Sequence, residues 1–287
     1  MINAGDIPPG APRPEMASRA SEPRAETAVN HMEFYRPSAE LKRTHAKLVT
    51  LLGTDRAECV EAAAVVEHLR QMWRPSQPRI VLLAESHVWT LAHEARSIVL
   101  QPDGVQTGFA RFVYCLGASE PKLVSPRVHP NKAGYQYWKL LHDCVRGPDE
   151  PHIGLLRSTN AKRRVENKLQ LLKDARDAGI WLVDASISAL YRPSEEGRSS
   201  TRVVRGKKAY GKVLQTCWDN YVGPVMRAAA PPIVLVIGKG VEDAVGELLR
   251  RDLGEAVRVE VVKQPNTPMS VAELEEYRGR IFTVCRR

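Results

Sequence analysis

The sequence predicts an α/β fold in three layers, with a central parallel sheet of about four strands and helices on both faces. Two observations lead to this prediction. Continuous apolar runs rich in branched residues, typical of strands buried on both faces, occur at residues 79–86, 179–186, 231–240 and 257–266. A segment with the apolar spacing of a helix precedes each run. Strands that alternate with helices in this way form parallel sheets.

The helices can be followed in order along the chain. Residues 37–53 place leucines near one face and stop at Gly53, which predicts a first helix that ends there. Further helices are expected before the strands and at the end of the chain, at residues 55–73, about 160–178, about 212–229, 241–254 and 270–285. The long insert after the first strand is harder to interpret: residues 134–147 favour a helix, and residues 108–117 fit a strand or a helix.

The chain divides into a tail and one domain. Residues 1–31 hold five prolines and two glycines with almost no large apolar side chain, so we expect a disordered tail. Residues 32–287 are expected to form a single domain, since 43% of the chain is hydrophobic and its length suffices for one substantial core.

Charge and cysteine usage narrow the function classes. The net charge of +9 favours a polyanionic partner such as a nucleic acid. The five cysteines are far apart and never have CxxC spacing, so we expect free thiols in the cytoplasm and neither a disulfide framework nor a zinc ribbon. No stretch approaches the roughly 20 apolar residues that span a bilayer, so no membrane contact is expected. The oligomeric state stays open.

Polar residues follow each predicted strand. In open parallel sheets, ligands bind beyond the carboxyl ends of the strands, so these side chains are expected to converge on one crevice. They comprise an acid, hydroxyls, a lysine and amides: Glu85, Ser86, His87, Asp184, Ser186, Ser188, Lys239, Gln264 and Asn266.

These residues also have structural interpretations. Glu85 and Asp184 could equally cap a helix or a turn. Lys239 stands between two glycines that are as typical of a turn before a helix as of a phosphate loop. His87 and His93 do not form a metal-binding motif, so neither a metal nor a cofactor is expected.

A serine hydrolase is a minor alternative. Ser86 and Ser186 lie near strand ends, and His87 is adjacent to the first of them. Neither serine has the flanking glycines of the GxSxG turn that exposes a nucleophile.

The segment 197–217 is the strongest nucleic-acid feature. It is free of acids, and its Ser, Thr and Gly residues predict a flexible loop beside the crevice. Flexible cations can neutralise phosphates, although a solvated loop has the same composition. The predicted backbone contacts are its six basic residues: Arg198, Arg202, Arg205, Lys207, Lys208 and Lys212.

The layout of these strand tips resembles the uracil-DNA glycosylase superfamily. The stretch "LLAESHV" is similar to its first motif, which has the form Gly-Glu-x-Pro-Gly or a relative, and "VVKQPNT" is similar to its second motif, His-Pro-Ser. Glu85 and Pro265 are kept, whereas Gln264 stands in place of the histidine. The iron–sulfur cysteines of some branches are not evident.

The resemblance implies hydrolysis of an N-glycosidic bond in DNA, with a flipped base held in a pocket. Glu85 would orient the water, and Gln264 or Asn266 would donate to the departing base. Asp184 or Ser186 would read the base edge. An aromatic ring from the insert, either Phe109 or Phe112, would stack on the base. Lys239 is also expected to contribute to substrate binding. The alternative is a non-catalytic nucleic-acid- or nucleotide-binding protein of the same fold.

Overall fold

The structure is a computed structural model that describes residues 36–100, 106–120, 123–124, 135–152, 158–193 and 200–286. All of them belong to one compact unit, Tyr35–Arg287. The tail expected at residues 1–31 lies outside the described residues, as does Arg198.

Four parallel strands form the central sheet, in the order β4-β1-β7-β8. They are β1 (Ile80–Ala84), β4 (Ile180–Asp184), β7 (Ile233–Ile237) and β8 (Arg258–Val262). Leu82 of β1 is in register with Leu182 on one side and with Leu235 on the other. The chain leaves β1 toward β4 and later returns to the other side of β1 with β7. The carboxyl ends of β1 and β7 therefore form the topological switch point, where such sheets bind ligands.

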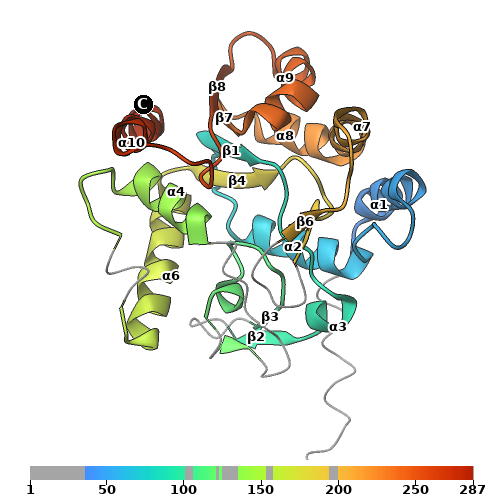
Figure 1. Ribbon diagram of the computed structural model, residues 1–287, viewed down its shortest axis with the longest axis horizontal. Helices are drawn as coiled ribbons and strands as arrows, with labels where there is room; N and C mark the ends of the chain where they lie inside the picture. Colours follow the sequence, from blue (N-terminus) through green and yellow to red (C-terminus); the bar gives the residue numbers. More distant parts are fainter. Residues whose placement is uncertain are drawn as a thin grey trace, which may run out of the picture. The chain divides into compact units, whose positions relative to one another are not determined.

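Helices cover both faces of the sheet (Figure 1), which confirms the predicted three-layer fold. On one face, α10 (Val271–Arg286) packs on α4 (Tyr135–Val145), α4 packs on α6 (Ala161–Asp177), and α6 packs on β4. On the other face, α7 (Lys207–Cys217) and α8 (Gly223–Ala229) pack on α9 (Lys239–Leu253), which lies against β7 and β8. Near this second group, α1 (Ala39–Leu52) contacts both α7 and α2 (Val60–Met72).

Burial explains why the strands are so apolar. Every residue of β1 and β4 is buried, because both strands have helices above and below. The edge strand β8 differs from the expected strand buried on both faces, since only Val262 is fully buried. Its Glu260 reaches the edge and pairs with Arg280 of α10 at 3.0 Å, which is how an edge strand tolerates charge.

The segment 197–217 contains more regular structure than the flexible loop predicted from its composition. Ser200–Arg202 forms β6, which pairs antiparallel with β5 (Tyr191–Pro193), and α7 begins at Lys207. Val204, Tyr210 and Val213 are buried and anchor the segment to the core. The single helix expected at about 212–229 is instead three pieces, α7, a π-helical turn η6 (Trp218–Val222) and α8.

The described residues of the insert between β1 and α4 contain little regular structure. The insert begins with the short helix α3 (Ala92–Ala95) and the hairpin of β2 (Ile98–Leu100) and β3 (Gln106–Gly108), and it includes the 3-10 turn η3 (Leu116–Ala118). Between the end of β3 and the start of η3, residues 109–115 form neither the strand nor the helix considered for residues 108–117. Their apolar side chains are buried all the same, and the antiparallel bridge between Val88 and Arg111 holds the segment in place. The helix expected at 134–147 is confirmed as α4.

No helix among the described residues combines the length and the apolar composition needed to cross a bilayer.

Candidate functional site

A pocket of about 630 Å³ opens beyond the carboxyl ends of β1, β7 and β8. We call it the strand-tip pocket. Glu85 and Gln264 follow the first and last strands of the sheet and meet in it, although they are far apart in the chain. The other polar and aromatic lining residues come from β5, β6, the two neighbouring helices and the segment after β8: Tyr191, Arg202, Tyr210, Lys239, Lys263 and Thr267.

The carboxylate of Glu85 is the centre of this pocket. The Gln264 amide donates to its Oε2 at 2.8 Å, and the Tyr191 hydroxyl donates to the same oxygen at 3.1 Å. The Arg202 guanidinium donates to Oε1 at 2.6 Å. Glu85 is only 3% exposed, whereas the Arg202 side chain is 43% exposed, and the three donors together hold the carboxylate in one orientation.

Gly238 allows Gln264 to reach Glu85. This glycine ends β7 with a φ of +98°, a conformation that side-chain-bearing residues rarely adopt. A Cβ there would lie 2.8 Å from Cγ of Gln264. The glycine identified in the Gly-Lys-Gly sequence therefore turns the chain into α9 and leaves room for the Gln264 side chain.

Arg202 is held between two aromatic rings. Its guanidinium carbon lies 4.2 Å from the centre of the Tyr210 ring and 5.7 Å from that of Tyr191, which adds cation–π attraction to its ion pair. Burial and the nearby charge of Glu85 raise the pKa of Tyr191 to about 12. The Tyr191 hydroxyl therefore stays protonated and acts as a donor to Glu85 at neutral pH.

A second, larger cavity of about 1010 Å³ adjoins the pocket and shares Arg202, Tyr210 and Gly240 with it. We call it the basic groove. Five of the six predicted backbone contacts line it: Arg202, Arg205, Lys207, Lys208 and Lys212.

The cations of the basic groove differ in how they are paired. Arg202 pairs with Glu85, and Lys207 pairs with Asp243 at 2.9 Å. Lys239, beside the groove, also reaches Asp243, at 3.3 Å. The three remaining cations of the groove are exposed and form no ion pair with any described residue: Arg205, Lys208 and Lys212.

A buried charged cluster joins His87 and Asp184, two of the strand-tip residues, to Glu58, which the sequence did not indicate. The imidazole of His87 contacts Glu58 through Nε2 at 2.6 Å and Asp184 through Nδ1 at 3.2 Å. Its backbone N–H also donates to Asp184, at 3.0 Å. Glu58 accepts two further backbone bonds, from Thr90 at 2.6 Å and Ala189 at 3.2 Å. All three charged side chains are almost fully buried.

The position between two carboxylates determines the charge of His87. Burial alone would lower its pKa, but the charges and hydrogen bonds of Glu58 and Asp184 raise it to about 10. His87 is therefore an imidazolium at neutral pH. It ties the tip of β1 to the tip of β4 and to the loop before α2.

The structure places other predicted site residues away from the pocket. Asp184 faces His87. The Ser186 hydroxyl donates to the carbonyl of Ser188 at 2.7 Å and serves a local turn. Phe109 is fully buried in the core, and Phe112 stands edge-on to His87.

The remaining predicted residue of the last strand tip lies outside the pocket lining. Asn266 is exposed in the turn after β8, and the neighbouring Thr267 takes part in the lining instead. None of these placements tests a role in substrate binding, and the roles stay predictions.

The hydroxyls considered for nucleophilic catalysis are also engaged. Ser86 Oγ donates to the carbonyl of His87 at 3.0 Å and accepts from the N–H of Leu190 at 3.1 Å. Within the described part of the chain, neither Ser86 nor Ser186 is hydrogen-bonded to an imidazole. The geometry therefore gives no support to a serine hydrolase.

The sequence analysis did not identify Tyr191 and Glu58 as partners of the strand-tip residues. Tyr191 stands shortly after the second strand and is an aromatic residue near the basic segment, but nothing in the sequence indicated its bond to Glu85. Glu58 gave no signal, because it precedes α2 and lies far from any strand tip in the sequence.

Comparisons of the chain with protein-family models, with curated proteins and with solved structures give no match.

The His87 cluster predicts a decline of stability in mildly alkaline solution. His87 is protonated in the folded state up to a pKa of about 10 but only up to about 6.5 when unfolded. Its contribution is complete below pH 6.5 and is lost as the pH rises toward 10. We expect the unfolding free energy from urea titrations to fall by about 1.4 kcal/mol per pH unit between pH 7 and 9.

Glu58→Gln should flatten this decline, because the imidazolium loses one of its two carboxylates. His93→Gln changes an exposed histidine on α3 and should leave the decline unchanged. Equal slopes for the wild type and Glu58→Gln would contradict the assignment.

Proposed function

We propose that this protein binds a nucleic acid, DNA in the first instance, with phosphates along the basic groove and one base in the strand-tip pocket. The observation that carries the proposal is the direct connection of the two cavities. Arg202 and Tyr210 line both of them, so a strand lying in the groove has the pocket within reach.

The groove has the features that phosphates require. Arg205, Lys208 and Lys212 are exposed cations without an acidic partner among the described residues. The first turn of α7, which begins at Lys207 without a side-chain cap, also supports anion binding, since helix N-termini carry free N–H groups and partial positive charge.

The pocket has features that suit a base. Tyr191 and Tyr210 supply aromatic surface on which any base can stack. The Gln264 amide, which donates one N–H to Glu85, has a second N–H for a polar group on a base edge, and Glu85 would become an acceptor for the base once Arg202 releases it. The groove would then fix the strand, and the pocket would read one nucleotide.

A second candidate function is the hydrolysis implied by the resemblance to uracil-DNA glycosylases. The meeting of Glu85 and Gln264 at 2.8 Å favours it, because they are the residues at the corresponding positions of the two motifs. In this reaction the bond between sugar carbon and base nitrogen breaks, and the oxygen of a water molecule bonds to the sugar carbon. The base leaves with the bonding electrons and takes up a proton, and its charge is stabilised by donors such as Gln264.

The bonds to Glu85 set a condition for hydrolysis that binding alone does not have. Arg202 and the pair Gln264 and Tyr191 already use both oxygens of Glu85. Hydrolysis requires Arg202 to release Glu85, so that the carboxylate can orient a water. A phosphate in the groove would compete for Arg202 and favour that release.

Removal of the unpaired cations tests the binding proposal. For duplex DNA, three phosphate contacts give a slope of about −2.7 for log affinity against log salt concentration, from about 0.9 per contact. We expect Arg205→Gln/Lys208→Gln/Lys212→Gln to weaken binding at least tenfold at low salt and to reduce the slope by about that amount. Fluorescence anisotropy with a labelled oligonucleotide measures both.

The matched control is Lys42→Gln/Lys162→Gln/Arg163→Gln, which removes the same charge from exposed positions on α1 and α6. It should keep the wild-type slope. Equal effects of the two triple variants would show that only net charge matters and would overturn the proposal that the basic groove binds phosphates.

A base-release assay tests the second candidate. We expect Glu85→Gln to reduce release of a modified base from single- or double-stranded DNA by at least a hundredfold, because the carboxylate that orients the water is lost. Glu255→Gln, an exposed acid before β8, should release it at the wild-type rate. Release by Glu85→Gln at the wild-type rate rules out this mechanism, and a wild type that binds DNA but releases no base leaves the binding function alone.

A further inference from the structure

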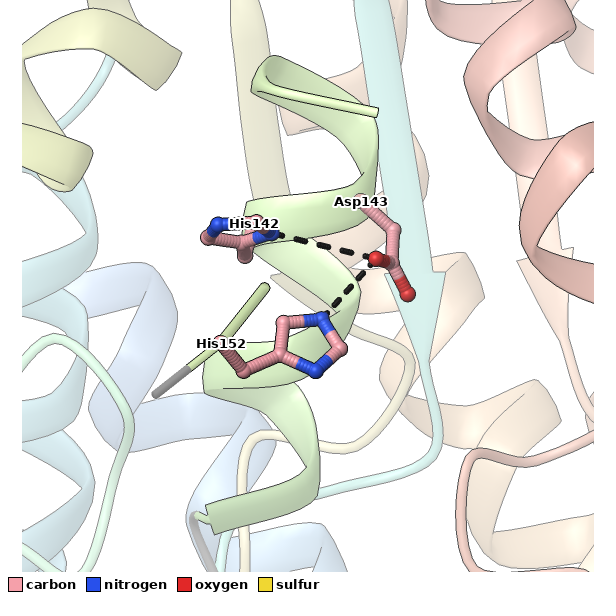
Figure 2. Close-up of side chains that lie close together, drawn as sticks. All are labelled: His142, Asp143 and His152. Atoms are coloured by element: carbon pink, nitrogen blue, oxygen red, sulfur yellow. Dashed lines mark hydrogen bonds and ion pairs between the residues drawn. The ribbon is translucent and has the colours of Figure 1, made fainter. Parts of the chain in front are cut away.

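A cluster of metal-ligating side chains lies on the face of the sheet covered by α4 and α10. His142 and Asp143 belong to α4, and His152 lies in the turn that follows it (Figure 2). Each offers one ligand atom, and these atoms lie within 4.8 Å of one another. None of the three residues lines the strand-tip pocket or the basic groove.

We propose that His142, Asp143 and His152 form a binding site for a divalent transition-metal cation of the zinc type. Two imidazoles and one carboxylate are a donor set that such ions prefer, whereas Mg²⁺ and Ca²⁺ prefer oxygen alone. Three protein ligands also leave a fourth position for water.

The spacing of the ligand atoms suits such an ion. His142 Nδ1 lies 3.8 Å from Asp143 Oδ1, and His152 Nε2 lies 2.9 Å from the same oxygen. In a tetrahedral site with metal–ligand bonds of about 2.0 Å, neighbouring ligand atoms are about 3.3 Å apart. Side-chain rotations would bring both distances to this value and would also have to bring together the two ring nitrogens, which lie within 4.8 Å of each other. Figure 2 shows both rings turned toward the carboxylate of Asp143.

The state of His142 points independently to a ligand. The residue is 4% exposed, and its Nδ1 has no hydrogen-bond partner among the residues that the structure describes. A buried, unpaired polar atom costs about 1–3 kcal/mol, and most such atoms in proteins are satisfied. The other ring nitrogen, Nε2, lies 4.0 Å from Oε1 of Glu150. Metal-binding histidines commonly place a carboxylate at the second nitrogen, where it orients the ring.

Arg278 of α10 competes for this position. Its guanidinium donates two bonds to Asp143 Oδ1, at 3.0 and 2.8 Å, and contacts His152 Nε2 at 3.4 Å. Asp143 and His152 thus already face a cation. Repulsion between two positive charges requires Arg278 to turn outward when the metal binds. Its side chain is 20% exposed, which gives it a route to solvent.

Calorimetric titration of the full chain with Zn²⁺, after treatment with a chelator, tests the site. We expect one equivalent to bind per chain. His152→Ala should weaken this binding at least tenfold, and since His152 lies in a partly exposed turn, this variant should fold. His93→Ala, at an exposed histidine elsewhere, should bind as the wild type does and controls for adventitious imidazole binding.

Arg278→Ala provides the sharpest test, because it removes the competing positive charge and leaves all three proposed metal ligands unchanged. We expect it to tighten Zn²⁺ binding at least tenfold. Zn²⁺ should also raise the unfolding midpoint of the wild type and of Arg278→Ala, but not that of Asp143→Asn. The absence of a Zn²⁺ equivalent in Arg278→Ala, or binding that survives His152→Ala unchanged, would overturn the proposal.

Discussion

The architecture around the strand tips depends on one buried cation, the imidazolium of His87 between Glu58 and Asp184. Each of the three charges would be very costly to bury alone, so the three segments that carry them must come together. They are the loop before α2, the tip of β1 and the tip of β4. This constraint sets the direction in which the chain leaves β1 and thereby the place of Glu85, two residues earlier. The strand-tip pocket therefore depends on a charged cluster whose three residues do not line it.

The fold could be predicted from the sequence because it depends on short-range patterns. The four strands follow from continuous apolar runs such as residues 80–84, and most of the helices follow from their apolar spacing. The irregular insert was unpredictable for a physical reason. Residues 108–117 bury apolar side chains against the rest of the core without forming the regular backbone bonds that a sequence period reflects.

The site was predictable only as far as topology determines it. Parallel strands bring Glu85 and Gln264 to one edge of the sheet, and their meeting follows from that. The contact between His87 and Glu58 does not follow from the strand topology, because the position of Glu58 depends on how α2 packs against the rest of the fold. The basic segment shows the same limit. Its charges indicated a polyanion, but Arg202 is also the ion-pair partner of Glu85, a contact made by the β5–β6 hairpin.

The position of Arg202 in the lining of both cavities has a thermodynamic consequence. One guanidinium pairs with the acid of the pocket and lines the groove, so in the proposed function a ligand that attracts it in one cavity would change the binding free energy of a ligand in the other. Such coupling is reciprocal: an anion that draws Arg202 outward changes the affinity of the pocket by the same factor by which a pocket ligand changes that of the anion. The sign of this cooperativity depends on the charge of the pocket ligand. A neutral guest that hydrogen-bonds the freed Glu85 would gain from the anion, and an acidic one would lose.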